Sequence, residues 1–286
     1  MIIVLGATGT IGQLLVTQLK KASQDFVIIA RNIEAAKQQF NSQSIRFADL
    51  DKPNTLLPAF KGGNALFLLS GHGQNMEAQQ LAAIDAAKQA GIQHIVKISG
   101  CEASISPSSS TETGREHYRI EQHLKNSTSH FVILRCNFFM QNLLDQAASM
   151  VRKNGKILMP FHKNTPFSFI DAQDIAHCAA VALTQKAHLG KTYYLTGQPS
   201  SFMALSNALS TKLNKKVTYK KIPLWLTKLV MRLKGGEPRI IRHQMEMAKL
   251  FLKGAGKKDT NKVLELTGGQ PSTLNDFIDK NIAHFQ

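Results

Sequence analysis

The sequence predicts an α/β protein with a Rossmann-like, doubly wound parallel sheet and a smaller, mostly helical C-terminal lobe. In the first half of the chain, short β-branched runs alternate with helical patterns, and a glycine-rich turn follows the first run. This alternation stops after residue 154. We therefore expect a Rossmann domain over residues 1–154, to which residues 167–197 return. The C-terminal lobe is expected over residues 198–286, together with a hairpin at 155–166.

Seven runs are expected to form strands. Residues 2–5 are wholly apolar, which is typical of a central strand buried on both faces. The other predicted strands cover residues 26–30, 44–48, 65–70, 93–99, 131–135 and 191–196. Helical patterns separate these runs. A long one covers about 75–90 and stops at Gly91, because glycine commonly follows the end of a helix.

Composition excludes several classes of protein. Of the 286 residues, 43% are apolar, yet no run of about 18 apolar residues occurs, so neither a disordered chain nor a membrane span is expected. The opening residues lack the basic segment of a signal peptide. Cys101, Cys136 and Cys178 lie far apart, which indicates neither a disulfide framework nor a metal site and fits a reducing cytoplasm.

The net charge is +16, and it is concentrated in the second half of the chain. Residues 151–286 hold 22 of the 35 Lys and Arg but only 8 of the 19 Asp and Glu. An anionic partner is one interpretation, and a solubilising helical surface is the more ordinary one. Nucleic-acid binding is not expected, because no recognition motif accompanies the charge.

An apolar helical stripe, built around Trp225, Leu229 and Leu233, lies among these basic residues. We expect it to dock the lobe over the sheet. Peripheral contact with an anionic membrane is the alternative.

The first strand-to-helix turn carries the clearest functional signal. It consists of Gly6, Ala7, Thr8, Gly9, Thr10, Ile11 and Gly12. In a dinucleotide site the first glycine allows a tight turn, the second lets a pyrophosphate approach, and the third lets helix and strand pack closely. The helix N-terminus offers free N–H groups to the phosphates. The turn therefore predicts dinucleotide binding.

Arg31 indicates which dinucleotide is bound. NAD sites usually place Asp or Glu at the end of the second strand to bind the ribose hydroxyl. Here Arg31 stands at that position, and a guanidinium binds a 2′-phosphate bidentately. We therefore expect a preference for NADP(H), with NAD(H) still possible. The alternative is that Arg31 merely ends the strand in solvent.

The turn and several later segments resemble the NmrA-like group of atypical short-chain dehydrogenases. The similar segments include ADLD at 48–51, KISG at 97–100, EHYRIEQHL at 116–124, LRCNFFMQN at 134–142 and FSFIDAQDIA at 167–176. The resemblance covers nearly the whole chain. It implies that the cofactor site also includes Asp49, Leu50, Ser70, Gly71, Lys97 and Ser99. A solvated position at the strand end is the alternative for Lys97.

The acid–base dyad of classical short-chain dehydrogenases is missing. Those enzymes use Tyr-x-x-x-Lys on a helix, whereas Tyr118 is followed four residues later by Gln122. The remaining catalytic candidates are Tyr118 and His117, and Glu121 lies one turn beyond His117. Either Glu121 orients His117 as a proton donor, or the two form a helix-surface pair that supports the preceding loop.

The segment after the sixth strand is the candidate substrate wall. Phe138, Phe139, Met140 and Asn142 suit an apolar pocket for a planar ring, although such residues are also typical of a core. Reduction of a quinone requires little acid–base assistance, because a hydride adds to an electron-poor ring.

We therefore expect a cytoplasmic NADPH-dependent oxidoreductase that acts on a quinone or a similarly electrophilic small molecule. The NmrA resemblance leaves one alternative, which is a non-catalytic NADP(H)-binding redox sensor that reports to a protein partner.

Overall fold

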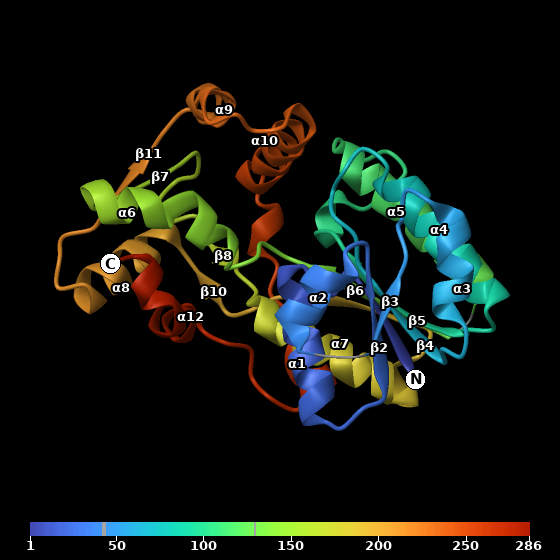
Figure 1. Ribbon diagram of the computed structural model, residues 1–286. Coiled ribbons are helices and arrows are strands. Elements are labelled where there is room, and N and C mark those ends of the chain that lie inside the picture. Colours follow the sequence, from blue (N-terminus) through green and yellow to red (C-terminus); the bar gives the residue numbers. More distant parts are fainter. Residues whose placement is uncertain (42–43, 129) are drawn as a thin grey trace.

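The computed structural model describes residues 1–41, 44–128 and 130–286. These residues form a central, seven-stranded parallel sheet in the order β3-β2-β1-β4-β5-β6-β9 (Figure 1). The strands are β1 (Ile2–Leu5), β2 (Phe26–Ala30), β3 (Ile45–Phe47), β4 (Ala65–Leu68), β5 (His94–Ser99), β6 (Phe131–Cys136) and β9 (Lys191–Leu195). The strand order reverses between β1 and β4, so the predicted doubly wound fold is confirmed.

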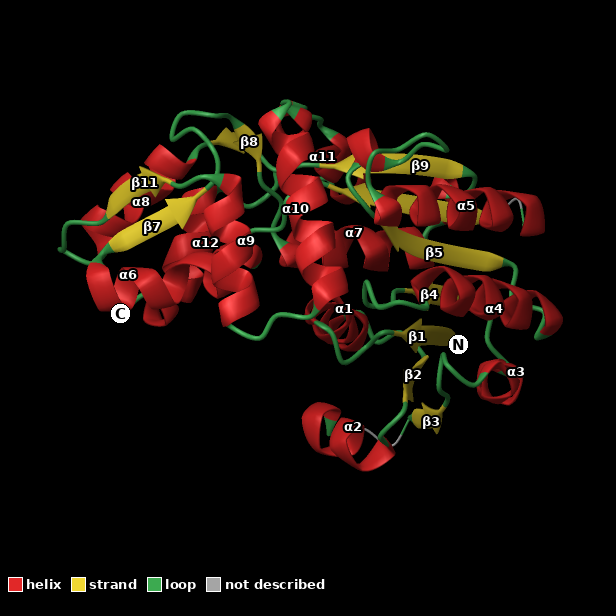
Figure 2. Cartoon of the chain, turned by 90° about the horizontal axis from the view of Figure 1, so that it is seen from above, coloured by secondary structure: helices red, strands yellow, loops and turns green. Residues whose placement is uncertain are grey.

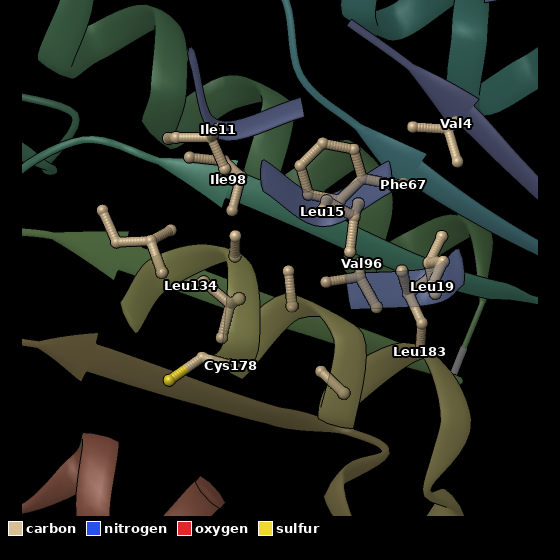
Figure 3. Packing of buried hydrophobic residues seen from close by; sticks show 14 of the residues in the cluster. Val4, Ile11, Leu15, Leu19, Phe67, Val96, Ile98, Leu134, Cys178 and Leu183 are labelled. Atoms are coloured by element: carbon tan, nitrogen blue, oxygen red, sulfur yellow. The ribbon is translucent and has the colours of Figure 1, made fainter. Parts of the chain in front are cut away.

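Helices cover both faces of this sheet. One face carries α1 (Thr10–Lys21), α2 (Ile33–Phe40), α7 (Ala172–Thr184) and α11 (Lys262–Thr267), and the other carries α3 (Leu56–Phe60), α4 (Met76–Gln89) and α5 (Glu112–Ser127). Side chains alternate along each strand, so Val4 and Phe67 pack against α1 and α7 (Figure 3). Ile3 and Leu66 pack against the other layer. Both faces are therefore core, which explains the apolar strands.

The C-terminal lobe lies beyond the carboxyl ends of the sheet strands (Figure 2). Its helices are α6 (Ser149–Asn154), α8 (Phe202–Lys212), α9 (Leu224–Leu233), α10 (Pro238–Leu252) and α12 (Leu274–Asn281). Its short strands are β7 (Lys156–Met159), β8 (Phe167–Ser168), β10 (Pro199–Ser200) and β11 (Thr218–Lys221). The lobe is mostly helical, as the sequence predicts.

The hairpin expected over residues 155–166 does not form. Instead, β7 pairs in parallel with β11, and β8 pairs antiparallel with β10. Phe161, between the two supposed arms, is buried against Phe167 and Phe202 of the lobe core. The partner strands come much later in the chain, and a local pattern of turn residues does not encode such long-range pairing.

The expected docking of the apolar stripe is also wrong. No residue of α9 is buried, and Trp225 and Leu233 are 66% and 79% exposed. Figure 1 shows α9 at the outer edge of the lobe, with α10 between it and the Rossmann domain. The stripe therefore faces outward, away from the sheet.

Candidate functional site

The three glycines of the first turn serve different purposes. Gly6 has a φ of +83°, and a Cβ there would lie 2.4 Å from the Leu69 carbonyl oxygen. A Cβ on Gly12 would lie 2.1 Å from the Gly6 carbonyl oxygen. Gly9 has an ordinary φ of −79°, and the nearest atom to its Cβ would be 3.6 Å away. The protein's own packing requires glycine at 6 and 12 but not at 9, so Gly9 leaves room on the outer side of the turn.

This outer side is the N-terminus of α1. Gly9 is the N-cap, with no side chain to cap the helix, and no acidic residue occupies the first turn. Thr8 and Thr10 are exposed, whereas Ala7 and Ile11 are buried and anchor the turn. A 12-residue helix with uncapped N–H groups and no acidic residue in its first turn attracts an anion. The residues present therefore fit a pyrophosphate.

Arg31 directly follows β2 and is exposed. Its charge acts on Asp51, whose pKa is lowered mainly by hydrogen bonds from Gln79 and Asn75, with a smaller contribution from Arg31. The sequence did not predict this acidic neighbour. Because β2 pairs in parallel with β1, Arg31 lies at the same sheet edge as the glycine turn that follows β1.

Four of the residues that the resemblance implies for the cofactor site, Asp49, Leu50, Ser70 and Gly71, follow β3 and β4. One oxygen of Asp49 accepts the N–H of Asp51 at 3.1 Å, and the Ser70 hydroxyl accepts the Gln80 amide at 2.9 Å. Leu50 is half-buried, and Gly71 is exposed with no atom within 4 Å of a supposed Cβ. The topology therefore brings these residues to the same sheet edge as the glycine turn.

Lys97 and Ser99 of β5 point toward α5. The Lys97 side chain is fully buried, so the alternative of a solvated strand end is wrong. Its Nζ donates to the Ile98 carbonyl at 2.8 Å and lies 3.1 Å from His117 Nδ1. Ser99 Oγ donates to Glu121 Oε1 at 2.7 Å. Burial lowers the pKa of Lys97 to about 7.

Glu121 does not orient His117, and the two do not form a surface pair. Glu121 is fully buried and accepts two hydrogen bonds from Arg135, at 2.6 and 3.1 Å, as well as the one from Ser99. His117 is also buried, and it turns toward Lys97 instead. The i,i+4 spacing places both residues on one helix face. Each nevertheless contacts a charged residue of the sheet, because Lys97 of β5 meets His117 and Arg135 of β6 meets Glu121.

The Nε2 atom of His117 is buried, and no hydrogen-bonding partner for it exists among the residues that the structure describes. It faces Gly100, where a Cβ would lie 3.5 Å from Nε2. Burial and, next, the charge of Lys97 hold the pKa of His117 well below its usual value. A neutral imidazole with one unpaired ring nitrogen therefore lies at the end of β5.

Two further histidines continue from His117. The His72 ring lies 5.7 Å from the His117 ring and 4.6 Å from the His243 ring, measured between centroids. His243 Nδ1 lies 2.9 Å from Thr113 Oγ1. Burial lowers the pKa of His72 to about 3 and also lowers that of His243. These three histidines therefore form a row that runs from His117 on α5 to His243 on α10.

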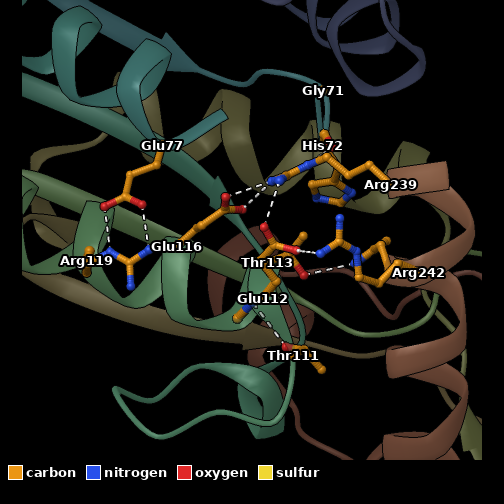
Figure 4. A network of polar contacts seen from close by, with 12 residues as sticks. Gly71, His72, Glu77, Thr111, Glu112, Thr113, Glu116, Arg119, Arg239 and Arg242 are labelled. Carbon is orange, nitrogen blue, oxygen red and sulfur yellow. Dashed lines mark hydrogen bonds and ion pairs between the residues drawn. The ribbon is translucent and has the colours of Figure 1, made fainter. Parts of the chain in front are cut away.

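Arg239 of α10 connects the lobe to the Rossmann domain (Figure 4). It makes ion pairs with Glu116 at 2.7 Å and with Glu112 at 3.0 Å, and it donates to the His72 carbonyl at 3.2 Å. Sequence reasoning missed it, because Arg239 looks like one of many basic surface residues. Its partners lie more than 120 positions earlier in the chain.

The other predicted site residues have simpler surroundings. Tyr118 is half-buried on α5. Phe138 lies in an aromatic cluster with Phe167, Phe169 and Phe251, and Met140 is 1% exposed in the same core. Phe139 packs against the sheet core, and Asn142 is half-buried. This burial favours the core interpretation of Phe138 and Met140.

The residues that the structure describes lack two features. They contain no helix that is both long and apolar enough to cross a membrane. They also contain no group of His, Cys, Asp or Glu arranged to hold a metal ion.

Comparison with known proteins gives consistent matches. A sequence model of the NmrA-like family matches residues 1–280. The whole chain is 32% identical to NAD(P)H azoreductase of Xenophilus azovorans and covers 99% of it. Quinone oxidoreductase 2 of Escherichia coli is 27% identical over 78% of each chain. An NADPH-dependent quinone oxidoreductase from Escherichia coli, solved with NADPH, matches 99% of this chain and 100% of its own, with a TM-score of 0.88 at 24% identity, which shows the shared fold.

Proposed function

Since the chain belongs to the NmrA-like family, as the sequence resemblance predicted, we propose that it is an NAD(P)H-dependent oxidoreductase that transfers a hydride from NADPH to a quinone or a similarly electrophilic small molecule. The observation that carries this proposal is the open position at Gly9. Its missing side chain is not required by packing, and it stands at an uncapped helix N-terminus. A bound pyrophosphate explains both features.

The names of the relatives support the class of acceptor. One is named an azoreductase and another a quinone oxidoreductase. Azo compounds and quinones are both electron-poor, conjugated acceptors of a hydride. The bound NADPH would supply that hydride from its nicotinamide ring. The protein's task is then to hold donor and acceptor in contact and to stabilise the negative charge that develops on the acceptor.

We propose that His117 stabilises this negative charge. An ammonium group has only hydrogen-bond donors, so protonated Lys97 donates to His117 Nδ1, and the imidazole proton must then lie on Nε2. The unpaired Nε2–H is a buried donor, which is costly unless an acceptor binds it. We propose that the oxygen or nitrogen of the reduced substrate is this acceptor.

Lys97 positions His117 and holds its tautomer. With a pKa of about 7, Lys97 is also able to return a proton to His117 near neutral pH. Such a His–Lys pair would take the place of the missing Tyr-x-x-x-Lys, and no phenolic proton from Tyr118 is then required.

A redox sensor remains the second candidate, and the missing dyad is the observation that favours it. Oxidation of NADPH, followed by nicotinamide absorbance against a panel of quinones and azo compounds, separates the two. We expect turnover, with kcat reduced about 10- to 150-fold in His117→Ala, as for a hydrogen bond to a charged group. His123→Ala is the matched control, because His123 is a half-buried histidine on the same helix that pairs with Asp85 instead. Tight NADPH binding without any turnover would favour the sensor.

A further inference from the structure

α9 presents an apolar face to solvent. Trp225, Leu229 and Leu233 are spaced at i, i+4 and i+8 and therefore lie in one row along the helix. Their exposed fractions are 66%, 44% and 79%, and Val230 beside them is 40% exposed. Monomeric proteins rarely leave such a contiguous row of large apolar side chains uncovered, so this row marks an interaction surface.

Basic side chains border this row. Lys228 and Arg232 lie on the adjacent face of α9 and line one side of a groove of about 480 Å³ between α9 and α10. Arg242 and Lys249 line the groove, with an apolar floor that includes Ile241 and Met245. The acidic residue of the lining is Glu246, and its carboxylate accepts the N–H of Glu112 at 2.9 Å. The surface therefore combines exposed apolar side chains with an excess of positive charge.

We propose that α9 is a peripheral membrane anchor, which lies in the plane of an anionic lipid bilayer with Trp225, Leu229 and Leu233 in the interfacial region. A 10-residue helix is about 15 Å long, too short to cross a bilayer, whereas an interfacial helix needs only an apolar face and basic flanks. Lys228 and Arg232 would meet the lipid phosphates, and tryptophan is enriched at this depth.

Charge decides between a bilayer and a second copy of the chain. In a symmetric dimer built on this face, Lys228, Arg232 and their neighbours would meet the same residues of the partner copy. Each chain carries a net charge of +16, so such contacts repel. An anionic bilayer has the opposite charge and an apolar interior, and it complements both properties of the surface. This inference does not depend on the proposed reductase activity.

The protein contains a single tryptophan, so Trp225 reports directly on this surface. Its fluorescence is measured with vesicles of phosphatidylcholine alone and with vesicles that also contain phosphatidylglycerol. We expect a blue shift and quenching by brominated lipid chains only with the anionic vesicles, and reversal by added salt. Unchanged Trp225 emission with anionic vesicles at low salt would overturn the proposal.

Two pairs of variants separate charge from apolar contact. The double variant Lys228→Gln with Arg232→Gln removes two charges. Each charge contributes about fivefold to vesicle affinity, so the double variant should bind about 25-fold more weakly. The control, Lys21→Gln with Lys88→Gln, removes two exposed charges elsewhere and should weaken binding far less. Leu233→Ser should reduce affinity at least about tenfold, whereas Leu264→Ser, a leucine that is 37% exposed on α11, should not.

Three results would contradict a specific membrane anchor. The first is that a test variant and its control weaken vesicle binding equally, in either of the two pairs. The second is a vesicle affinity unchanged in Leu233→Ser. The third is sedimentation at twice the monomer mass that Leu233→Ser abolishes, which would assign the face to a second copy. Circular dichroism of each variant checks that it is folded.

Discussion

Arg239 offers a sharp test of how the lobe is held against the Rossmann domain. Its side chain is 10% exposed, and that of its partner Glu116 is 8% exposed. Arg239→Ala would remove the ion pair that the structure shows for the buried Glu116 carboxylate. Breaking a buried ion pair in this way typically costs 3–5 kcal/mol, and we expect about 3 kcal/mol because Glu112, the second partner, is 32% exposed.

Arg119 provides the matched control. It also pairs bidentately with a glutamate on a neighbouring helix, Glu77, at 2.6 Å for both contacts. There the side chains are 51% and 26% exposed, so Arg119→Ala should cost less than about 1 kcal/mol. Both variants remove a guanidinium that is paired with a glutamate, but Arg239 is far more buried and also contacts Glu112 and the His72 carbonyl.

Urea unfolding, followed both by circular dichroism and by Trp225 fluorescence, measures the two free energies. Trp225 lies on α9. A change in its fluorescence at lower urea than the change in circular dichroism would show that this part of the lobe separates from the Rossmann domain before the sheet unfolds. Adding Glu116→Gln to Arg239→Ala should recover part of the loss, because it removes the uncompensated charge. Equal losses in Arg239→Ala and Arg119→Ala, or no recovery in the double variant, would refute this reasoning.

Three further predictions concern the glycine turn, Arg31 and the buried Lys97. Gly9→Val should abolish dinucleotide binding while the circular dichroism spectrum stays unchanged, because packing does not require glycine there; retained affinity in calorimetry would disprove the site. Arg31→Ala should weaken NADPH binding by about 10- to 150-fold and leave NADH nearly unchanged; calorimetric titration of both cofactors decides this, and an equal loss of both would contradict it. Lys97 has its pKa lowered from 10.5 to about 7, so the unfolded chain binds more protons between these values and stability should rise with pH across that window. Lys97→Met should flatten that rise in urea unfolding measured from pH 7 to 10, and an unaltered slope would show that Lys97 is not responsible.

The sequence predicted the Rossmann domain well for a physical reason. Apolar runs, helical spacing and glycine positions are local signals, and a parallel sheet with both faces covered needs little else to define it. The turn from Gly6 to Gly12 was placed correctly because strand, glycines and helix are contiguous in the chain.

The predictions failed where partners lie far apart in the sequence. The pairing of β7 with β11 could not be read from the turn residues around 155–166. The contact between His117 and Lys97 spans 20 residues and depends on how α5 crosses β5, whereas helical spacing suggested Glu121 instead. The ion pair between Arg239 and Glu116 spans 123 residues, and nothing distinguishes Arg239 locally from its basic neighbours.

The activity that we propose for this chain is hydride transfer from NADPH to an electrophilic acceptor. Single-turnover oxidation of the protein–NADPH complex by a quinone tests it most directly, with the nicotinamide carrying either hydrogen or deuterium at the transferred position. Hydride transfer predicts oxidation of one NADPH for each quinone reduced, and a primary isotope effect that slows the deuterated reaction. A complex that binds NADPH but is not oxidised by any quinone or azo compound would contradict the claim.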